Sequence, residues 1–312
     1  GSMKKTSLIF SILTLSLFLN NCGGGGGGGG SSSSTSSFVT SEYNQQYGLA
    51  SIKASKAYDR GYNGNGVKVA VLDGGFDLAH TDLDGNFITG YDTEDSDNTP
   101  GAESHNTTMG GHGTHVAGII AAEKNDSGMH GVAYNASIIP VKVFKDNGTA
   151  VSGMNLGIDY ATDNGAIALN NSWGTSRSVS GTCNGVNCYI SVPYESSTGG
   201  FSSAEVTSWA GVATDNNVAV FAAGNNGNNS STGAIKRYRT SDNAYLYSLT
   251  AQQTVDNGWI SYTNRSTAEA QYALNASAVA NNWINVIALD SNNTIASYSN
   301  GCGNTKAYCI AA

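Results

Sequence analysis

The chain has 312 residues, of which only 12% are charged, and its formal net charge is −8. This length is sufficient for one large domain with a substantial buried core, and an apolar fraction of 39% is too high for a disordered chain. The 15 Lys and Arg residues do not cluster, which argues against a nucleic-acid partner, and a Gly-rich composition with little charge is typical of an exported bacterial protein.

The first 22 residues are predicted to lie outside the folded domain, as a two-residue cloning scar followed by an export signal. A basic start precedes an apolar run, Leu8 to Leu19, which is shorter than the roughly 20 apolar residues of a membrane-spanning helix. The segment that ends at Cys22 resembles the lipobox of bacterial lipoproteins, whose Cys is acylated. Asn21 stands where the lipobox usually has a small residue, so an ordinary secreted protein is the alternative.

Residues 23–37 are a run of Gly followed by a run of mostly Ser. Such a segment has no apolar surface to bury and is predicted to be a flexible tether, although a linker between soluble domains has the same composition. With acylation at Cys22, the tether predicts a protein held at the bacterial cell envelope or surface by a lipid anchor in the membrane. The folded domain is predicted to span residues 38–312.

Short apolar runs alternate with helical segments along this domain. Strands are predicted at residues 67–72, 137–144, 166–170, 218–223 and 284–289, and helices at 116–122, 152–163 and 204–214. The alternation predicts an α/β fold in three layers, with a mainly parallel twisted sheet and helices on both faces. Ligands of such sheets bind at the carboxyl ends of the strands. Two polar stretches, 175–202 and 226–282, are predicted to be surface insertions.

Four Cys residues of the domain fall into two local pairs, in the segments CNGVNC and CGNTKAYC. In an exported chain, local disulfides are the natural interpretation, although other pairings remain open. A metal site is disfavoured because no His or further Cys lies near either pair. The predicted disulfide cysteines are Cys183, Cys188, Cys302 and Cys309.

Three polar residues follow a predicted strand or open a predicted helix. Asp73 ends the segment VAVLD, His112 stands in GHGTHVAG, and Asn225 follows AAG. Taken singly, Asp73 and Asn225 are expected to be turn or cap residues. His112 and His115 could face a metal together, but no third ligand lies near them in sequence, so His115 is interpreted as a core residue.

Together, and in this order, the three motifs resemble those of the subtilisin-like serine peptidases. Further similar segments are found at residues 131–133, 141–143, 171–174 and 286–290, so the resemblance covers the chain from about residue 47 apart from the two insertions. It implies the subtilisin fold and an extracytoplasmic serine endopeptidase whose substrates are polypeptides. The segment from Cys302 to Ala312 is most similar to the passenger domains of autotransporter subtilases.

The resemblance also implies roles for individual residues. Asp73 would orient His112, His112 would serve as general base and then general acid, and Asn225 would donate a hydrogen bond to the oxyanion. Two segments would form the walls of the pocket for the residue before the scissile bond: Ser172, Trp173 and Gly174, and Ala222, Ala223 and Gly224. An extended substrate would pair with the edge formed by Gly148, Thr149 and Ala150. The small residues of the second wall favour a pocket with room for a large apolar side chain.

One member of the family's catalytic triad has no counterpart here. The family's nucleophilic Ser lies in a Gly-Thr-Ser-Met-Ala type motif, which this sequence lacks. We therefore expect that the chain stops before the nucleophile, that the C-terminal part of the fold is missing, and that the chain is inactive as written. No cofactor is expected. Asp82 and Asn125 match side chains of a common calcium site of the family, but a further ligand aligns poorly, near Tyr43, so calcium is not assigned.

Two functions are compatible with these observations. The first is a lipid-anchored, extracytoplasmic serine endopeptidase of the subtilisin type, of which this chain is a truncated form. The second is a non-catalytic, lipid-anchored surface protein that uses the same scaffold to bind peptides.

Overall fold

The structure is a computed structural model in which residues 1–35 and 36–312 form separate units. It describes residues 36–107, 109–175, 177–183, 186–192, 196–225, 237–239, 244–246, 259–261 and 266–312. The predicted export signal, Cys22 and most of the predicted tether lie outside these residues. In the part of the chain that is described, no helix is both long enough and apolar enough to span a bilayer.

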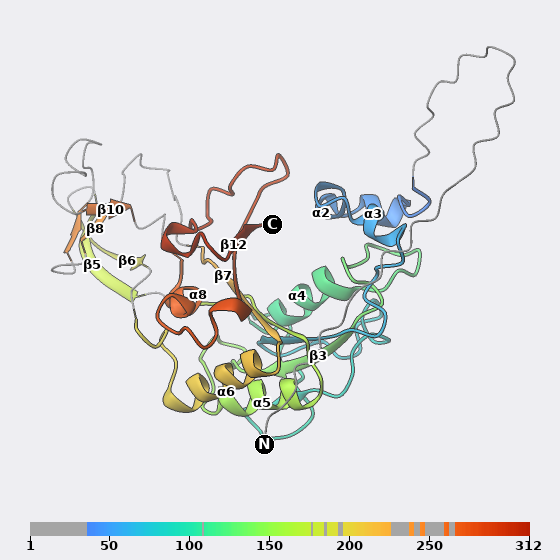
Figure 1. The fold of residues 1–312 in the computed structure, drawn as a ribbon, viewed down its shortest axis with the longest axis horizontal. Coiled ribbons are helices and arrows are strands. Elements are labelled where there is room, and N and C mark those ends of the chain that lie inside the picture. The colour runs from blue at the N-terminus through green and yellow to red at the C-terminus, as the bar shows by residue number, and fades with distance from the viewer. Residues whose placement is uncertain are drawn as a thin grey trace, which may run out of the picture. The chain divides into compact units, whose positions relative to one another are not determined.

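A seven-stranded sheet forms the centre of the second unit (Figure 1). Its strands are β1 (Lys68–Asp73), β2 (Tyr91–Asp92), β3 (Ser137–Lys142), β4 (Ala168–Asn171), β7 (Val218–Ala222), β11 (Trp283–Ile287) and β12 (Cys309–Ala311). They lie in the order β2-β3-β1-β4-β7-β11-β12, and every neighbouring pair is parallel. The predicted parallel sheet is therefore confirmed, with β1 between β3 and β4.

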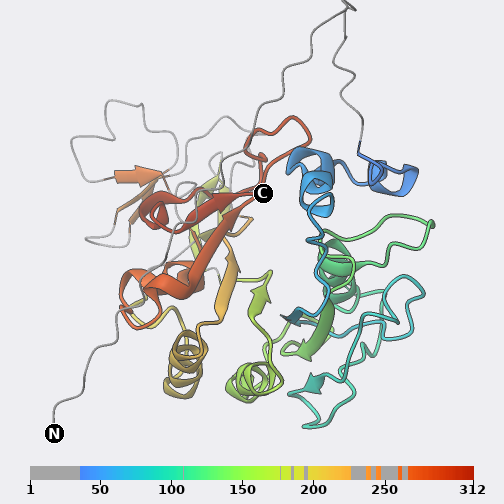
Figure 2. The same ribbon diagram turned by 45° about the vertical axis from the view of Figure 1, so that its right-hand side comes forward.

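Helices cover both faces of the sheet (Figure 2). Successive side chains of a strand point to opposite faces, so Ala70 and Leu72 contact one layer while Val71 contacts the other. The first layer contains α5 (Met154–Asp163) and α6 (Ser203–Thr214), and the second contains α4 (His112–Ala121). The predicted three-layer architecture is confirmed. The larger core, between the sheet and α5 and α6, includes the buried side chains Ile158, Leu169, Trp209, Phe221 and Trp283.

The predicted strands and helices are present, with ends that differ by a few residues from the expected ones. The exception is the first helix, α4, which begins at His112 rather than at residue 116. The sequence did not predict β2 or β12, which have only two and three residues. Three short N-terminal helices were also not predicted: α1 (Ser41–Asn44), α2 (Tyr47–Ser51) and α3 (Ala54–Tyr58).

The two predicted insertions need correction at their ends. The first contains an antiparallel hairpin of β5 (Arg177–Cys183) and β6 (Val186–Val192), and its last part returns to the core through Phe201. The second contains β8 (Arg237–Arg239), β9 (Ala244–Leu246) and β10 (Trp259–Ser261), which pair in the order β10-β8-β9. Residues 266–282 were wrongly included in it, because this segment forms α8 (Ala268–Gln271), η3 (Tyr272–Leu274) and η4 (Ala280–Asn282), and all of its first eight residues are buried.

One of the two predicted disulfides is present. Cys302 and Cys309 are joined with an S–S distance of 2.04 Å, across η5 (Gly303–Thr305) and at the start of the edge strand β12. Cys183 belongs to β5 and Cys188 belongs to β6, but their side chains are outside the described part of the structure. Their pairing stays a prediction.

Candidate active site

Asp73 and His112 meet at the carboxyl end of the central strand. Asp73 is the last residue of β1 and is completely buried, while His112 is the first residue of α4 and its side chain is 34% exposed. The distance between Asp73 Oδ1 and His112 Nδ1 is 2.7 Å. Because a carboxylate can only accept, Nδ1 carries the proton and Nε2 is the basic nitrogen of the neutral ring. Within the described residues, Nε2 has no hydrogen-bond partner.

Glycines after β1 allow this close approach. Gly74 N–H donates to Asp73 Oδ1 over 2.8 Å, which fixes the carboxylate beside the strand end. A Cβ atom on Gly74 would lie 2.3 Å from the carbonyl oxygen of Met109, so only Gly fits there. The same carbonyl accepts from His112 N–H at 3.3 Å. The Gly therefore sets the position of the segment from which α4 begins.

The hydrogen bond that His112 donates to Asp73 raises the pKa of His112, and the negative charge of Asp73 adds to this effect. Burial opposes it, because a desolvated imidazolium is disfavoured. The net increase makes His112 a stronger base than a free imidazole. The second carboxylate oxygen, Oδ2, is buried and has no hydrogen-bond partner among the described residues.

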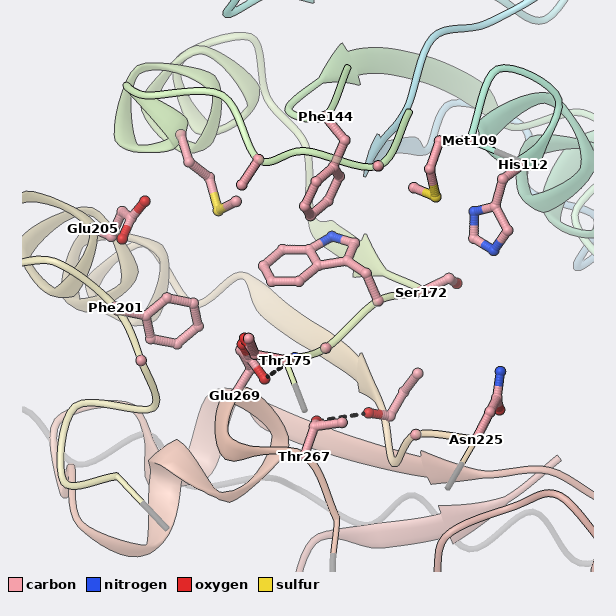
Figure 3. A pocket seen from close by; sticks show the side chains of 18 residues that line it. Met109, His112, Phe144, Ser172, Thr175, Phe201, Glu205, Asn225, Thr267 and Glu269 are labelled. Atoms are coloured by element: carbon pink, nitrogen blue, oxygen red, sulfur yellow. Dashed lines mark hydrogen bonds between the residues drawn. The ribbon is translucent and has the colours of Figure 1, made fainter. Parts of the chain in front are cut away.

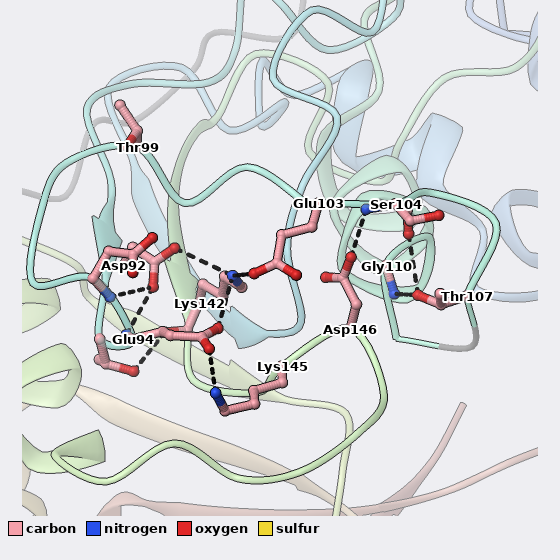
Figure 4. Close-up of polar contacts among 12 residues, drawn as sticks. Asp92, Glu94, Thr99, Glu103, Ser104, Thr107, Gly110, Lys142, Lys145 and Asp146 are labelled. Atoms are coloured by element: carbon pink, nitrogen blue, oxygen red, sulfur yellow. Dashed lines mark hydrogen bonds and ion pairs between the residues drawn. The ribbon is translucent and has the colours of Figure 1, made fainter.

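An ion cluster around the buried Lys142 side chain lies next to this strand end (Figure 4). The Lys142 side chain, at the end of β3, is 1% exposed, and its Nζ lies 3.4 Å from Asp92, 3.1 Å from Glu94 and 3.6 Å from Glu103. Burial lowers the pKa of Lys142, but the carboxylates of Glu94 and Asp92 outweigh this effect and raise it overall. Lys142 pairs in register with Asp73, so the cluster lies beside the strand end that carries Asp73.

His112 and Asn225 line one cavity of about 640 Å³ (Figure 3). Asn225 follows β7 with an exposed side chain, and Gly224 before it has a left-handed φ of 104°, which favours Gly. The remaining lining residues include Met109, Phe144, Gly148, Ala150, Met154, Ser172, Trp173, Gly174, Phe201, Glu205, Ala222, Gly224, Thr267 and Glu269. The structure thus brings the three candidate catalytic residues to one region.

Backbone groups along the cavity are free to pair with an extended chain. Ala150 forms an antiparallel bridge with Phe144, in which the neighbouring bonds are Lys145 N to Thr149 O and Val151 N to Val143 O. The N–H and C=O of Ala150 face the other way, and within the described residues they have no hydrogen-bond partner. The backbone N–H and C=O groups of Trp173 and Gly174, in the first of the two predicted walls, also have no hydrogen-bond partner among the described residues.

Backbone hydrogen bonds to neighbouring segments fix the second predicted wall. Ala223 N donates to Val286 O on β11, and Asn300 N donates to Gly224 O over 2.8 Å. Both walls line the cavity, the first through Ser172, Trp173 and Gly174 and the second through Ala222 and Gly224. Thr149 and Ala223 belong to the same segments but are not among the lining residues.

The other sequence predictions for this region have mixed outcomes. His115 is exposed, so its interpretation as a core residue was wrong. Asn125 Nδ2 donates to Asp82 Oδ1 over 3.0 Å, so the two side chains that match the family's calcium site are adjacent. The described residues contain no group of three His, Cys, Asp or Glu side chains that could hold a metal ion. Because backbone carbonyl groups can also bind calcium, this leaves calcium unassigned.

The fold and the site define a parallel α/β protein with a carboxylate-oriented histidine and unpaired backbone groups at the carboxyl ends of its strands. Residues 64–312 match the Subtilase family of peptidases, so the chain belongs to this family.

Individual relatives agree with this assignment. Subtilisin DY of Bacillus licheniformis is 41% identical over 133 residues, covering 41% of this chain and 44% of that protein. Thermitase of Thermoactinomyces vulgaris is 40% identical over 149 residues, covering 46% of this chain and 50% of that protein. An extracellular serine protease of Serratia marcescens is 39% identical over 46% of this chain and 13% of its own length. The alignments thus span half or less of each of these relatives.

A solved structure supports the fold over more of the chain. A protease from Pseudoalteromonas arctica superposes with a TM-score of 0.55 and 24% sequence identity, covering 87% of this chain and 70% of that protein. The predicted subtilisin-like α/β fold is therefore confirmed.

Sequence reasoning missed nine residues of the cavity lining, among them Thr267 and Glu269. Both come from the segment that was wrongly included in the second insertion. The run Ser266-Thr267-Ala268-Glu269 has the pattern of an N-capped helix start, and Thr267 does cap α8 by accepting from Ala270 N–H. That capping signal could have revealed the element, but not its contact with the cavity.

Proposed function

We propose that this chain carries the Asp–His pair, the oxyanion donor and the substrate-binding walls of an extracytoplasmic serine endopeptidase of the subtilisin type. The observation that carries the proposal is the 2.7 Å contact between Asp73 and His112 in a cavity that Asn225 also lines. Its relatives' names, which include an extracellular serine protease, support the same activity and location.

In this proposal, Asp73 holds the His112 ring so that Nε2 faces the bound peptide. Nε2 would take the proton from a nucleophile as it attacks the scissile carbonyl and would then give it to the leaving amine. The Asn225 amide would donate to the oxygen that becomes negative in this step. A donor of this kind is worth roughly 10²–10³ in rate.

The nucleophile is the one member of the proposed triad that we assign to none of the 312 residues. Ser172 lines the cavity, but its Oγ accepts a hydrogen bond from Asn170 over 2.9 Å and it belongs to the substrate wall. The chain alone is therefore expected not to hydrolyse peptides by the triad mechanism.

The proposed substrate is an extended polypeptide that pairs with the Gly148–Ala150 edge and with Trp173 and Gly174. An apolar part of the cavity, lined by Phe144, Met154 and Trp173, would accept one apolar side chain of this peptide. Attachment through an acylated Cys22 would place the domain at the envelope surface, where extended polypeptides are accessible.

Peptide binding tests the proposal directly. In ¹H–¹⁵N NMR spectra of the full chain, an acetylated octapeptide should shift the signals of Ala150, Gly174, Asn225 and the His112 ring together. A matched peptide with alternate N-methylated amides cannot form the ladder and should leave these signals unchanged. Shifts confined to other regions, or equal effects of both peptides, would contradict the proposal.

The free backbone edges also favour the second candidate, a peptide-binding protein without catalysis. A third outcome is that one of the serines of this chain acts as the nucleophile. A fluorophosphonate probe, which labels activated serines, tests for this outcome. We expect no labelling of this chain, whereas labelling that disappears in His112→Ala would show that one of its own serines is activated. The buried carboxylate of Asp73 favours the peptidase, since binding alone gives no reason to orient and strengthen a base.

A further inference from the structure

Thr267 lies between the two walls of the predicted pocket. A Cβ atom on Gly174 would lie 2.4 Å from Thr267 Cγ2, and a Cβ atom on Gly224 would lie 2.8 Å from the same methyl group. One methyl group therefore occupies the space between a glycine of the first wall and a glycine of the second. The sequence favoured room for a large apolar side chain at this point, because the second wall is built from small residues.

Hydrogen bonds fix the Thr267 side chain in this position. Its Oγ1 donates to Ala222 O over 3.1 Å and accepts from Ala270 N–H over 3.3 Å, and its own N–H donates to Ala223 O over 2.9 Å. The residue is only 2% exposed. Rotation of the side chain to clear the gap would break both bonds of the hydroxyl group, so Thr267 is a built part of the pocket.

We propose that Thr267 restricts the residue held between Ser172–Gly174 and Ala222–Gly224 to a small side chain such as Gly, Ala or Ser. This inference rests on the proposed function, because it assigns a substrate preference to the proposed peptide site. A Leu or Phe side chain that enters between the walls meets the Thr267 methyl group, whose neighbours are close-packed and leave it no room to move.

The carboxylate of Glu269 does not turn this pocket into a site for basic residues. Glu269 is 3% exposed, and its two oxygens accept from the N–H and the hydroxyl group of Thr175. The carboxylate is thus used within the protein, to connect α8 to the end of the first wall. A basic substrate side chain at the pocket is therefore expected to bind no more tightly than Ala.

A positional scan of peptides tests the inference. The peptides are acetylated octapeptides of Ala, Gly and Ser with one fixed Leu, in which a single Phe or Lys replaces each other position in turn. Binding to the full chain is measured by fluorescence anisotropy. We expect one position at which Phe weakens binding by at least about tenfold, since a single methylene-sized clash is worth roughly 10–200-fold.

Thr267→Ser is the informative variant, because it removes only the methyl group and keeps the hydroxyl that bonds Ala222 and caps α8. It should recover most of the binding lost to Phe at that one position. Thr214→Ser is the matched control: it removes the same methyl from an exposed Thr of α6, whose hydroxyl donates to Ala210 O, and should recover nothing.

Two results would overturn the inference while leaving the proposed function intact. One is that peptides bind, but Phe is tolerated at every position in the wild-type chain. The other is that Lys binds more tightly than Ala at the sensitive position. If no peptide of the set binds to either chain, the proposed function fails, and the inference fails with it.

Discussion

Two buried carboxylates next to the cavity are treated differently by their surroundings. Asp73 accepts a hydrogen bond from the basic side chain of His112 over 2.7 Å, whereas Glu269 accepts only from neutral donors, which include the N–H and the hydroxyl group of Thr175. Burial raises the pKa of Glu269 from 4.5 to about 7, and these hydrogen bonds offset only part of that effect. Glu269 therefore binds a proton more tightly in the folded chain than in the unfolded chain.

This raised pKa predicts a pH-dependent cost in stability. The favourable contribution of protonated Glu269 to the stability of the folded chain is fully present below its unfolded pKa of about 4.5. This contribution is lost as the pH rises through the folded pKa of about 7. Since one pKa unit corresponds to about 1.4 kcal/mol, Glu269→Gln should stabilise the chain by up to about 3 kcal/mol at pH 8 relative to its effect at pH 4. Urea unfolding at the two pH values measures the difference.

Asp159→Asn serves as the control, because Asp159 is exposed on α5 and its substitution removes the same charge. It should change the free energy of unfolding almost equally at both pH values. If Glu269→Gln behaves in the same way, the carboxylate of Glu269 does not carry the predicted cost.

At the scale of elements, the contact between the end of β1 and the start of α4 creates the site. These elements are far apart in sequence, and they approach because Gly74 leaves space for the Met109 carbonyl group. We expect Gly74→Ala to force these backbone segments apart and to destabilise the chain by roughly 1–3 kcal/mol, the typical cost of overpacking. It should also weaken the bond between Asp73 and His112, which lowers the pKa of His112.

Gly211→Ala is the matched control for this substitution. Gly211 is exposed in α6, and an added Cβ atom there has no neighbour within 4 Å. Because Ala is favoured over Gly inside a helix by up to about 1 kcal/mol, this variant should be slightly more stable than the wild-type chain. Denaturant unfolding checks both variants, and a Gly74→Ala chain as stable as Gly211→Ala would contradict the account.

The sequence predicted the long elements because each combines a clear apolar pattern with a clear end. β1 ends at Asp73-Gly74, and α5 ends at Asn164-Gly165. Short elements carry no such pattern: β2 and β12 have too few residues for an alternation to be seen, and β12 forms because β11 presents a free edge. The N-terminal helices have at most five residues, and the aromatic contacts of Tyr43 and Tyr58 with His130 help to hold two of them in place.

At the scale of the whole molecule, sheet order turns separate motifs into one site. Three motifs lie at the carboxyl ends of β1, β4 and β7: Asp73, Ser172–Gly174 and Ala222–Asn225. These strands are neighbours in the sheet although their sequence positions are far apart. The carboxyl ends of parallel strands lie at one edge, so the motifs were expected to meet there. The role of Thr267 could not be foreseen, since it depends on how α8 packs beneath two walls and on no local pattern.

The protonation state of His112 tests the central claim most directly. Long-range ¹H–¹⁵N NMR over a pH titration gives both the tautomer and the pKa of each His ring. We predict that neutral His112 carries its proton on Nδ1, and that Asp73→Asn lowers the His112 pKa while Asp159→Asn leaves it unchanged. A His112 that titrates at the same pH with Asp or Asn at position 73 would contradict the assignment of these two residues as a base and its orienting carboxylate.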